Sequence, residues 1–317
     1  MTATVIPVTS EAQWLAERAK DVTSTEVAAL YGLSPYLTEF ELWHRKATGV
    51  TEAPMDSERM RWGQRLESAI AHGVAEDHGW QVTKRAVYTR LDDYRLGASF
   101  DFEIHGDARG PGLLEVKNVD GLVFREQWVM VNEAREAPEH IELQLQTQLE
   151  VSGFSWGCIV ALVGGNEAHT LIRQRDEVIG RDIRARVRAF WQSVDAGTPP
   201  KPDFRRDAEF IIRQLRGRAD AGKSVDADPE LENLIAVYQR QSAAQREAEA
   251  NRDAVKAEIL LRIGDAAKVR SKLGSLSCGE TKEAKGTLIT AEMVGTYVGG
   301  RAGFRQFRFY PAKETPQ

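Results

Sequence analysis

Three charged residues at close spacing form the pattern in this chain that is best suited to chemistry. Asp101 is followed, after a glycine-rich turn, by Glu115 and Lys117. If residues 113–117 form a strand, Glu115 and Lys117 lie on the same face of it, at positions i and i+2. A hairpin between this strand and one over residues 95–104 would place Asp101 beside Glu115.

Two carboxylates with an ammonium group next to them predict a site for a hard divalent cation, since Mg²⁺ and Mn²⁺ prefer oxygen ligands. A bound ion could activate a water molecule and stabilise negative charge on a phosphodiester. Lys117 would hold the attacking water or the phosphoryl oxygens, and the carbonyl of Val116 could be a further metal ligand. The same three residue types also occur as surface charges on ordinary strands. The surrounding sequence therefore has to show whether these residues form a metal site.

The segments around this pattern predict a mixed α/β domain. Apolar residues at helical spacing and turn residues at the ends indicate helices over 24–30, 40–46, 57–77, 139–151 and 183–194. Short segments with strand character, separated by turn clusters, cover 86–91, 95–104, 113–117, 157–163 and 169–173. The apolar run over 157–163 is typical of a buried central strand. We therefore expect a mixed sheet flanked by helices, with Glu115 on one of its strands.

A proline-rich segment, Thr198-Pro-Pro-Lys-Pro202, is the best candidate for a linker. It predicts a first domain over residues 1–204 and a C-terminal extension over 205–317. Within the extension, residues 229–263 indicate one long charged helix, and residues 269–309 show glycine-rich turns and alternating segments that favour a small β structure.

The overall composition is that of an ordinary globular protein. Of 317 residues, 42% are hydrophobic and 28% are charged, and the mean hydropathy is −0.41. These values exclude wholesale disorder, a fibrous repeat and a membrane bundle. The N-terminus lacks the pattern of a secretory signal. The two cysteines, Cys158 and Cys278, lie too far apart to suggest a disulfide framework, so we expect a cytoplasmic protein with no membrane segment.

The net charge of −5 argues weakly against nucleic-acid binding, but the charge is unevenly distributed. The span 268–308 holds eight basic and three acidic residues, which gives +5 in an otherwise acidic chain. Such a tail could contact a polyanion. A solvated charged surface is the simpler alternative.

Several further motifs occur in the order found in one family of nucleases, over about residues 14–163. The blocks that match the family are Arg18 with Val22-Thr-Ser-Thr-Glu-Val27, Gly32-Leu-Ser-Pro-Tyr36, Glu41-Leu-Trp43, Trp62-Gly63 with Glu67, Ser99-Phe-Asp101, Glu115-Val-Lys117 and Gln144-Leu-Gln146. Together they resemble the phage lambda exonuclease and YqaJ-type viral recombinase family of the PD-(D/E)XK nuclease superfamily. The resemblance implies a restriction-endonuclease-like α/β core.

The resemblance also implies roles for residues around the acidic pair. Asp101 and Glu115 would bind metal, with Glu67 as a third carboxylate, and Lys117 would be the catalytic lysine. Gln146 would orient the lysine or the water.

A second group of residues would bind the terminal 5′-phosphate of DNA. Arg18, Thr25 and Ser99 match the family's phosphate-binding positions, and a guanidinium with hydroxyl donors suits a phosphate dianion. Arg125 is a candidate for the family's further phosphate-binding arginine, although it is not aligned with it. Thr25 replaces the usual serine and keeps the hydroxyl, and Phe100 replaces the usual proline.

The family's activity implies an Mg²⁺- or Mn²⁺-dependent 5′–3′ exodeoxyribonuclease, with two ions in its site. It would degrade one strand of linear duplex DNA from a 5′-phosphorylated end and leave a 3′ single strand for recombination. The resemblance further implies a homotrimer and a single-strand annealing partner, in a bacterial or phage-infected cell. Two alternatives stay open: an endonuclease or repair nuclease on the same core, and a catalytically silent DNA-binding or scaffold protein.

Overall fold

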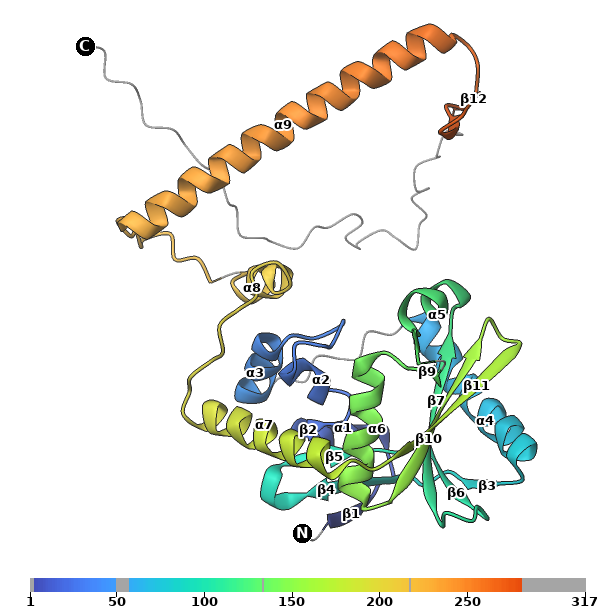
Figure 1. Cartoon of the computed structure of the whole chain (residues 1–317). Helices are drawn as coiled ribbons and strands as arrows, with labels where there is room; N and C mark the ends of the chain where they lie inside the picture. Colours follow the sequence, from blue (N-terminus) through green and yellow to red (C-terminus); the bar gives the residue numbers. More distant parts are fainter. Residues whose placement is uncertain (1–2, 50–56, 133, 217, 281–317) are drawn as a thin grey trace, which may run out of the picture. The chain divides into compact units, whose positions relative to one another are not determined.

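The computed structural model describes residues 3–49, 57–132, 134–216 and 218–280 (Figure 1). The chain divides into two compact units, residues 1–211 and 212–317. The division falls seven residues after the boundary expected at residue 204. Within the described residues, no helix is long and apolar enough to cross a membrane.

A five-stranded mixed sheet forms the centre of the first unit, in the order β11-β10-β7-β6-β3. The strands are β3 (Gln81–Thr83), β6 (Phe102–His105), β7 (Gly112–Val119), β10 (Trp156–Val163) and β11 (Glu167–Gln174). Strands β7 and β10 are parallel, whereas the other neighbours are antiparallel. The expected mixed α/β fold is thereby confirmed, with the predicted apolar strand over 157–163 at the position of β10.

Two helices cover opposite faces of this sheet (Figure 1). Helix α4 (Glu58–His78) packs Ile70 and Val74 into one cluster with Leu114 and Val160. Helix α6 (Glu139–Ser152) belongs to the other face. It packs Leu145 and Leu149 in a cluster with Leu113 and Ile159. Because side chains alternate along a strand, neighbouring residues of β7 and β10 supply both clusters, and Glu115 faces α6.

A second, smaller sheet was not expected from the sequence. It contains β1 (Ala3–Pro7), β4 (Val87–Leu91), β5 (Leu96–Ala98) and β2 (Val22–Thr23), in the order β1-β4-β5-β2. We predicted three strands over 86–91, 95–104 and 113–117, separated by turns. A one-turn 3₁₀ helix over Asp92–Tyr94 turns β4 back onto β5 in this second sheet, and the segment expected as one strand over 95–104 divides into β5 and β6, which belongs to the central sheet.

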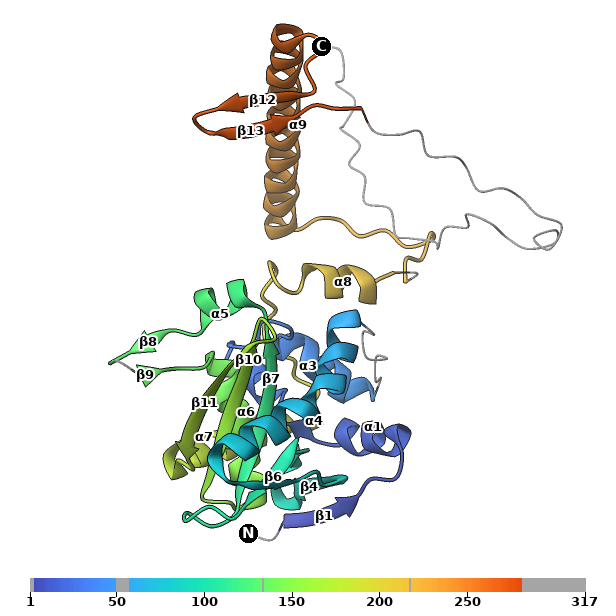
Figure 2. The same ribbon diagram turned by 90° about the vertical axis from the view of Figure 1, so that its right-hand side faces the viewer.

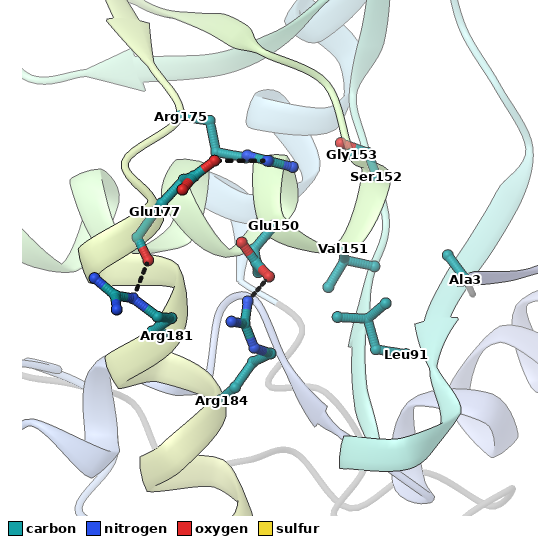
Figure 3. Close-up of a pocket in the computed structure, with 10 residues that line it drawn as sticks. All are labelled: Ala3, Leu91, Glu150, Val151, Ser152, Gly153, Arg175, Glu177, Arg181 and Arg184. Carbon is teal, nitrogen blue, oxygen red and sulfur yellow. Dashed lines mark hydrogen bonds and ion pairs between the residues drawn. The ribbon is translucent and has the colours of Figure 1, made fainter. Parts of the chain in front are cut away.

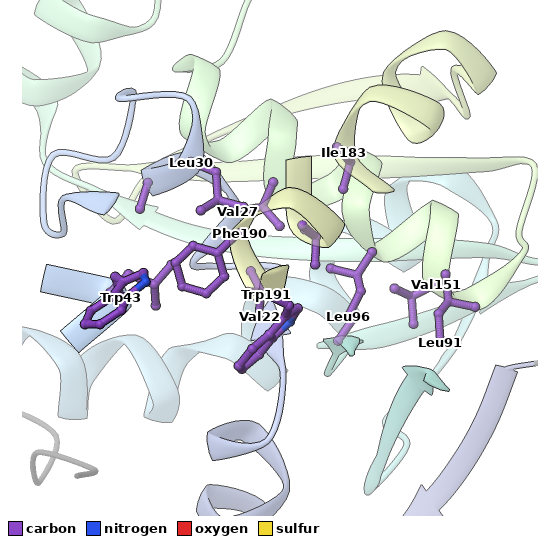
Figure 4. Packing of buried hydrophobic residues seen from close by; sticks show 14 residues of the cluster. Val22, Val27, Leu30, Trp43, Leu91, Leu96, Val151, Ile183, Phe190 and Trp191 are labelled. Carbon is purple, nitrogen blue, oxygen red and sulfur yellow. The ribbon is translucent and has the colours of Figure 1, made fainter. Parts of the chain in front are cut away.

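Besides α6, four helices contact the second sheet or the core that covers it. They are α1 (Glu11–Ala19), α2 (Val27–Leu30), α3 (Glu39–Thr48) and α7 (Glu177–Asp195). The core between them holds Leu30, Trp43, Leu96, Phe190 and Trp191 (Figure 4). Val22 and Val27 of this core flank Thr25, and the ion pair between Glu17 and Arg90 holds α1, which carries Arg18, against β4.

The remaining elements are short except for one helix. In the first unit they are α5 (Gly121–Gln127) and a hairpin of β8 (Met130–Val131) and β9 (Ala134–Arg135); α8 (Ala208–Gln214) begins there and ends in the second unit. The second unit contains α9 (Pro229–Ile263), whose bounds confirm the predicted long helix, and a hairpin of β12 (Lys268–Ser271) and β13 (Gly274–Ser277) (Figure 2). Most of the basic span 268–308 lies outside the described residues.

Candidate active site

The acidic pair and the lysine come together at the central sheet. Glu115, Val116 and Lys117 lie on β7, and Asp101 directly precedes β6. Phe102 pairs with Leu114 in the antiparallel ladder, which puts Asp101 next to Glu115. The Asp101 Oδ2 atom accepts a hydrogen bond of 2.8 Å from the Val116 amide. The hairpin expected from the sequence is therefore present and brings the two carboxylates to one place.

Glu115 is the centre of a hydrogen-bond network. Its side chain is only 2% exposed. The Nε2 atoms of Gln144 and Gln148 donate to its two carboxylate oxygens at 2.6 and 2.7 Å, and the Lys117 ammonium also donates to it. The amide oxygen of Gln144 accepts a second hydrogen bond from Lys117 at 3.2 Å. Helix α6 thus holds both the carboxylate and the lysine from the face of the sheet that it covers.

Gln146, which we expected to orient the lysine or water, points elsewhere. Its amide donates to the Gln174 carbonyl at 2.9 Å and accepts from the Asp176 amide at 2.9 Å. Successive helical residues turn by about 100°, so residues two apart lie on opposite flanks of a helix. Gln144 and Gln148, four apart, share the flank that faces Glu115. The prediction chose the wrong glutamine of this helix, and Gln148 was missed.

The pKa values of Asp101 and Lys117 are both raised in this site. Burial raises the pKa of Asp101 well above its usual range, and the neighbouring Glu115 carboxylate raises it further. Burial acts to lower the pKa of Lys117, but the negative charges of Glu115 and Asp101 outweigh this effect and raise it. Lys117 therefore stays protonated, but its single positive charge does not balance the carboxylates of Asp101 and Glu115. A divalent cation would supply the missing positive charge, so the donor set fits Mg²⁺ or Mn²⁺.

Glu67 lies close enough to contribute to this site electrostatically. It sits on α4, and its negative charge also raises the pKa of Asp101. Its Oε1 atom is paired with the Lys84 ammonium at 2.8 Å. Among the described residues, no group of three or more acidic, histidine or cysteine side chains is already arranged to hold a metal ion. Because a carboxylate has two oxygens, Glu67 could bind a metal ion through Oε2 while Oε1 stays paired with Lys84.

Three of the four expected phosphate-binding residues form a connected group. Arg18 on α1 donates from Nη2 to the Thr25 hydroxyl at 3.0 Å and lies over the Trp14 ring, 4.4 Å from its centroid. Trp14 in turn donates from Nε1 to the Ser99 hydroxyl at 2.8 Å. Thr23, which sequence reasoning missed, adds a hydroxyl 3.1 Å from that of Thr25. A guanidinium beside several hydroxyl groups is a suitable arrangement for a phosphate.

One residue of each group, Thr25 and Lys117, lines a cavity of about 340 Å³. The lining also includes residues that the sequence analysis did not assign: Ser34, Tyr36, Arg59, His140 and Gln144. Tyr36 belongs to one of the matched blocks, so the sequence could have indicated it as a site residue. Nothing in the sequence pointed to Arg59 or His140. Arg125 is exposed on α5 and is not part of the cavity lining, so the structure does not bring it to this site.

A second cavity lies away from these residues. Its volume is about 510 Å³, and none of the expected site residues lines it. Figure 3 shows an ion pair between Glu150 and Arg184 in its lining. Arg175 pairs with the Glu177 carboxylate there, and Arg181 donates to the Glu177 backbone carbonyl.

Comparisons with known proteins agree with the sequence motifs. The model of the YqaJ-like viral recombinase domain matches residues 13–155. The matched range includes every expected site residue, from Arg18 to Gln146, and the resemblance inferred from the motifs is confirmed.

A curated relative and two solved structures are similar to this chain. The uncharacterized protein YqaJ of Bacillus subtilis (strain 168) is 27% identical over 221 residues, which cover 68% of this chain and 67% of the relative. The alkaline exonuclease LHK-Exo from Laribacter hongkongensis is 22% identical with a TM-score of 0.47, covering 64% of this chain and 97% of that one. Its complex with dAMP gives a TM-score of 0.48 at the same identity and coverage.

Proposed function

We propose that this protein is a metal-dependent deoxyribonuclease that degrades one strand of linear duplex DNA from a 5′-phosphorylated end. The product would be a 3′ single strand available for recombination. One observation carries the proposal: Lys117, bonded to Glu115, and Thr25, bonded to Arg18, line the same cavity. A residue of the proposed hydrolytic group and a residue of the proposed phosphate-binding group at one cavity suit an enzyme that acts on DNA ends.

The residues of the site divide the work of hydrolysis. Asp101, Glu115 and the Val116 carbonyl would hold divalent ions, with Glu67 as a further ligand. Two Mg²⁺ or Mn²⁺ ions would supply activation of water and stabilisation of the leaving oxygen. The Lys117 ammonium would donate to a non-bridging oxygen of the scissile phosphate or hold the attacking water.

The second group of residues would select the end of the strand. Arg18, with its guanidinium positioned by Thr25 and Trp14, would pair with the terminal 5′-phosphate. Cleavage one nucleotide along the strand then requires the scissile phosphate to reach Lys117. The hydroxyl groups of Thr23 and Ser99 are near enough to the Arg18 group to add hydrogen bonds.

A time course of cleavage with linear and closed circular duplex DNA tests this function. We expect digestion of the linear DNA only, dependent on Mg²⁺, and faster with a 5′-phosphate than with a 5′-hydroxyl. Glu115→Gln should be inactive and serves as the control for contaminating nucleases. Cleavage of the circle would support an endonuclease instead. Binding of DNA without cleavage in any metal would support a silent DNA-binding protein.

The resemblance to the family supports two further proposals about assembly. The protein would form a homotrimer and would act together with a single-strand annealing protein. Sedimentation velocity of the full chain tests the first proposal, and a monomer at micromolar concentration would contradict it. For the second, a single-strand annealing protein encoded by the same genome should bind the purified chain, and absence of binding would contradict it.

A further inference from the structure

One wall of the catalytic cavity is a loop between α2 and α3. Ser34 and Tyr36 of this loop line the cavity together with Lys117. The Tyr36 side chain is 85% exposed, and its ring meets the His140 ring edge-on at 6.1 Å. The Ser34 hydroxyl accepts hydrogen bonds from the amides of Tyr36 and Leu37, at 3.3 and 3.1 Å. These bonds shape the loop but do not attach it to the rest of the protein.

Besides the Tyr36–His140 contact and the packing of Leu37 on the core, an attachment comes from a segment about 170 residues later in the sequence. Residues 203–210, which we call the strap, follow α7 and the proline-rich segment (Figure 1). Arg206 donates through its guanidinium to the carbonyls of Gly32, at 3.4 Å, and of Ser34. These carbonyls follow the end of α2, where helical hydrogen bonding stops and an outside donor is needed. The strap also lies outside residues 13–155, the range of the family match.

A buried carboxylate fastens the other end of the loop. Asp207 is fully buried, and it accepts hydrogen bonds from the Thr38 hydroxyl and, at 2.7 Å, from the Asp203 amide. The Thr38 hydroxyl in turn accepts from the Glu41 amide at 3.0 Å, which caps the N-terminus of α3. One hydroxyl therefore joins the strap to the helix, and both of its hydrogen-bonding roles are used.

Aromatic packing completes the attachment. Phe210, at the end of the strap, is 4% exposed. Its ring meets the Phe40 ring edge-on at 6.1 Å and lies 5.8 Å from the His44 ring. Both partners belong to α3, the helix that follows the loop. The strap thus contacts the loop at its beginning and its end, as well as the helix beyond it.

We propose that the strap positions the wall of the catalytic cavity, and that Arg206 and Asp207 are positioning residues for the binding of the DNA end. This inference rests on the proposed function, because it assumes that the cavity receives DNA. Neither residue lines the cavity, so both act through the loop. Loosening the strap would let Ser34 and Tyr36 move away from Lys117, while the hydrogen bonds among Glu115, Gln144 and Gln148 stay in place.

Arg206→Ala in the full-length protein tests the inference, with Arg205→Ala as the matched control. Arg205 is the adjacent strap residue with the same charge, its side chain is exposed, and within the described residues it has no side-chain hydrogen bond or ion pair. We expect the KM for a 5′-phosphorylated duplex to rise about tenfold in Arg206→Ala, with kcat within about threefold of wild type, because misplaced binding groups weaken binding first. Arg206→Lys, which keeps one donor, should recover part of the loss.

Two outcomes would overturn the inference. A general loss of folded protein would lower kcat in proportion to the active fraction and leave KM unchanged, which would make Arg206 a structural residue only. An equal rise of KM in Arg205→Ala would assign the effect to charge alone.

Amide hydrogen exchange separates this inference from the proposed function. Exchange at Tyr36 and Leu37 should become faster in Arg206→Ala and stay as in wild type in Arg205→Ala, whether or not the protein cleaves DNA. Unchanged exchange in Arg206→Ala would contradict the role of the strap. Wild-type protein that lacks nuclease activity would contradict the proposed function, and the exchange data would still decide whether the strap holds the loop.

Discussion

We expect Gln148→Met to slow DNA cleavage and the same substitution at Gln146 to leave the cleavage rate nearly unchanged. Both substitutions should lower the stability of the fold. Gln148 donates to the Ser99 carbonyl at 3.1 Å and to Glu115 at 2.7 Å, and its side chain is 2% exposed. Methionine has a similar length and adaptable packing but no N–H donor. The substitution therefore removes both hydrogen bonds with little change of volume, and it leaves Glu115 with two of its three side-chain donors.

The size of the effect follows from these two bonds. A neutral hydrogen bond contributes about 1 kcal/mol to the free energy of unfolding, and one to a charged group about 1.5–3 kcal/mol. Gln148→Met should therefore lower the free energy of unfolding of the metal-free protein by about 2.5–4 kcal/mol. Because Gln148 orients a proposed metal ligand, we expect the cleavage rate to fall about 10–100-fold, as is typical when such a supporting group is lost.

Gln146→Met is the matched control, because it places the same substitution two residues away on the same buried helix. Its two hydrogen bonds go to neutral backbone groups, so the expected loss is about 2 kcal/mol, and the cleavage rate should stay within about threefold of wild type. Urea unfolding gives the stability, and single-turnover cleavage of a 5′-phosphorylated duplex gives the rate. Equal rate losses in the two variants, or a Gln148→Met rate close to wild type, would refute the assignment of Gln148 to the active site.

Three other predictions concern the site and the core. Lys117→Ala should lose at least ~100-fold in cleavage rate, the usual scale for one positioned group, and near-wild-type activity would exclude its role. Arg18→Ala should slow digestion of 5′-phosphorylated ends far more than of 5′-hydroxyl ends, since only the former carry the dianion; equal slowing would make Arg18 structural. Burial raises the pKa of Cys158 to about 12, so its thiol should stay protonated and unreactive toward a thiol reagent from about pH 7 to 9, whereas the partly exposed Cys278 should react. One reactive thiol in native protein and two after denaturation would agree with this, and two in native protein would contradict it.

Local rules along the chain were enough to predict the acidic pair and the elements that carry it. Glu115 and Lys117 share a face because side chains alternate along any strand, whatever the strand packs against. The turn between β6 and β7 limits where Asp101 can lie, since a short hairpin pairs adjacent segments. The long helix over 229–263 was also predictable, because its end at Gly264 and its start at Pro229 are local signals.

Which glutamine faces the site could be decided only by the tertiary structure. The apolar residues Leu145 and Leu149 mark the face of α6 that packs on the sheet, and Gln148 and Gln146 lie on opposite flanks of that face. The sequence treats the two flanks alike, because helical periodicity identifies the buried face but not the neighbours on either side of it. The direction in which α6 crosses the sheet turns one flank toward Glu115 and the other toward the start of α7.

The wall of the catalytic cavity was even less predictable from the sequence, because long-range packing forms it. Tyr36, His140 and Lys117 come from three separate elements, and the strap that holds the loop is about 170 residues away from it in the sequence. No local pattern relates Asp207 to Thr38, because each residue alone is an ordinary polar residue near a helix end. Only the folded chain, which buries both side chains between α3 and the strap, turns them into a hydrogen-bonded pair.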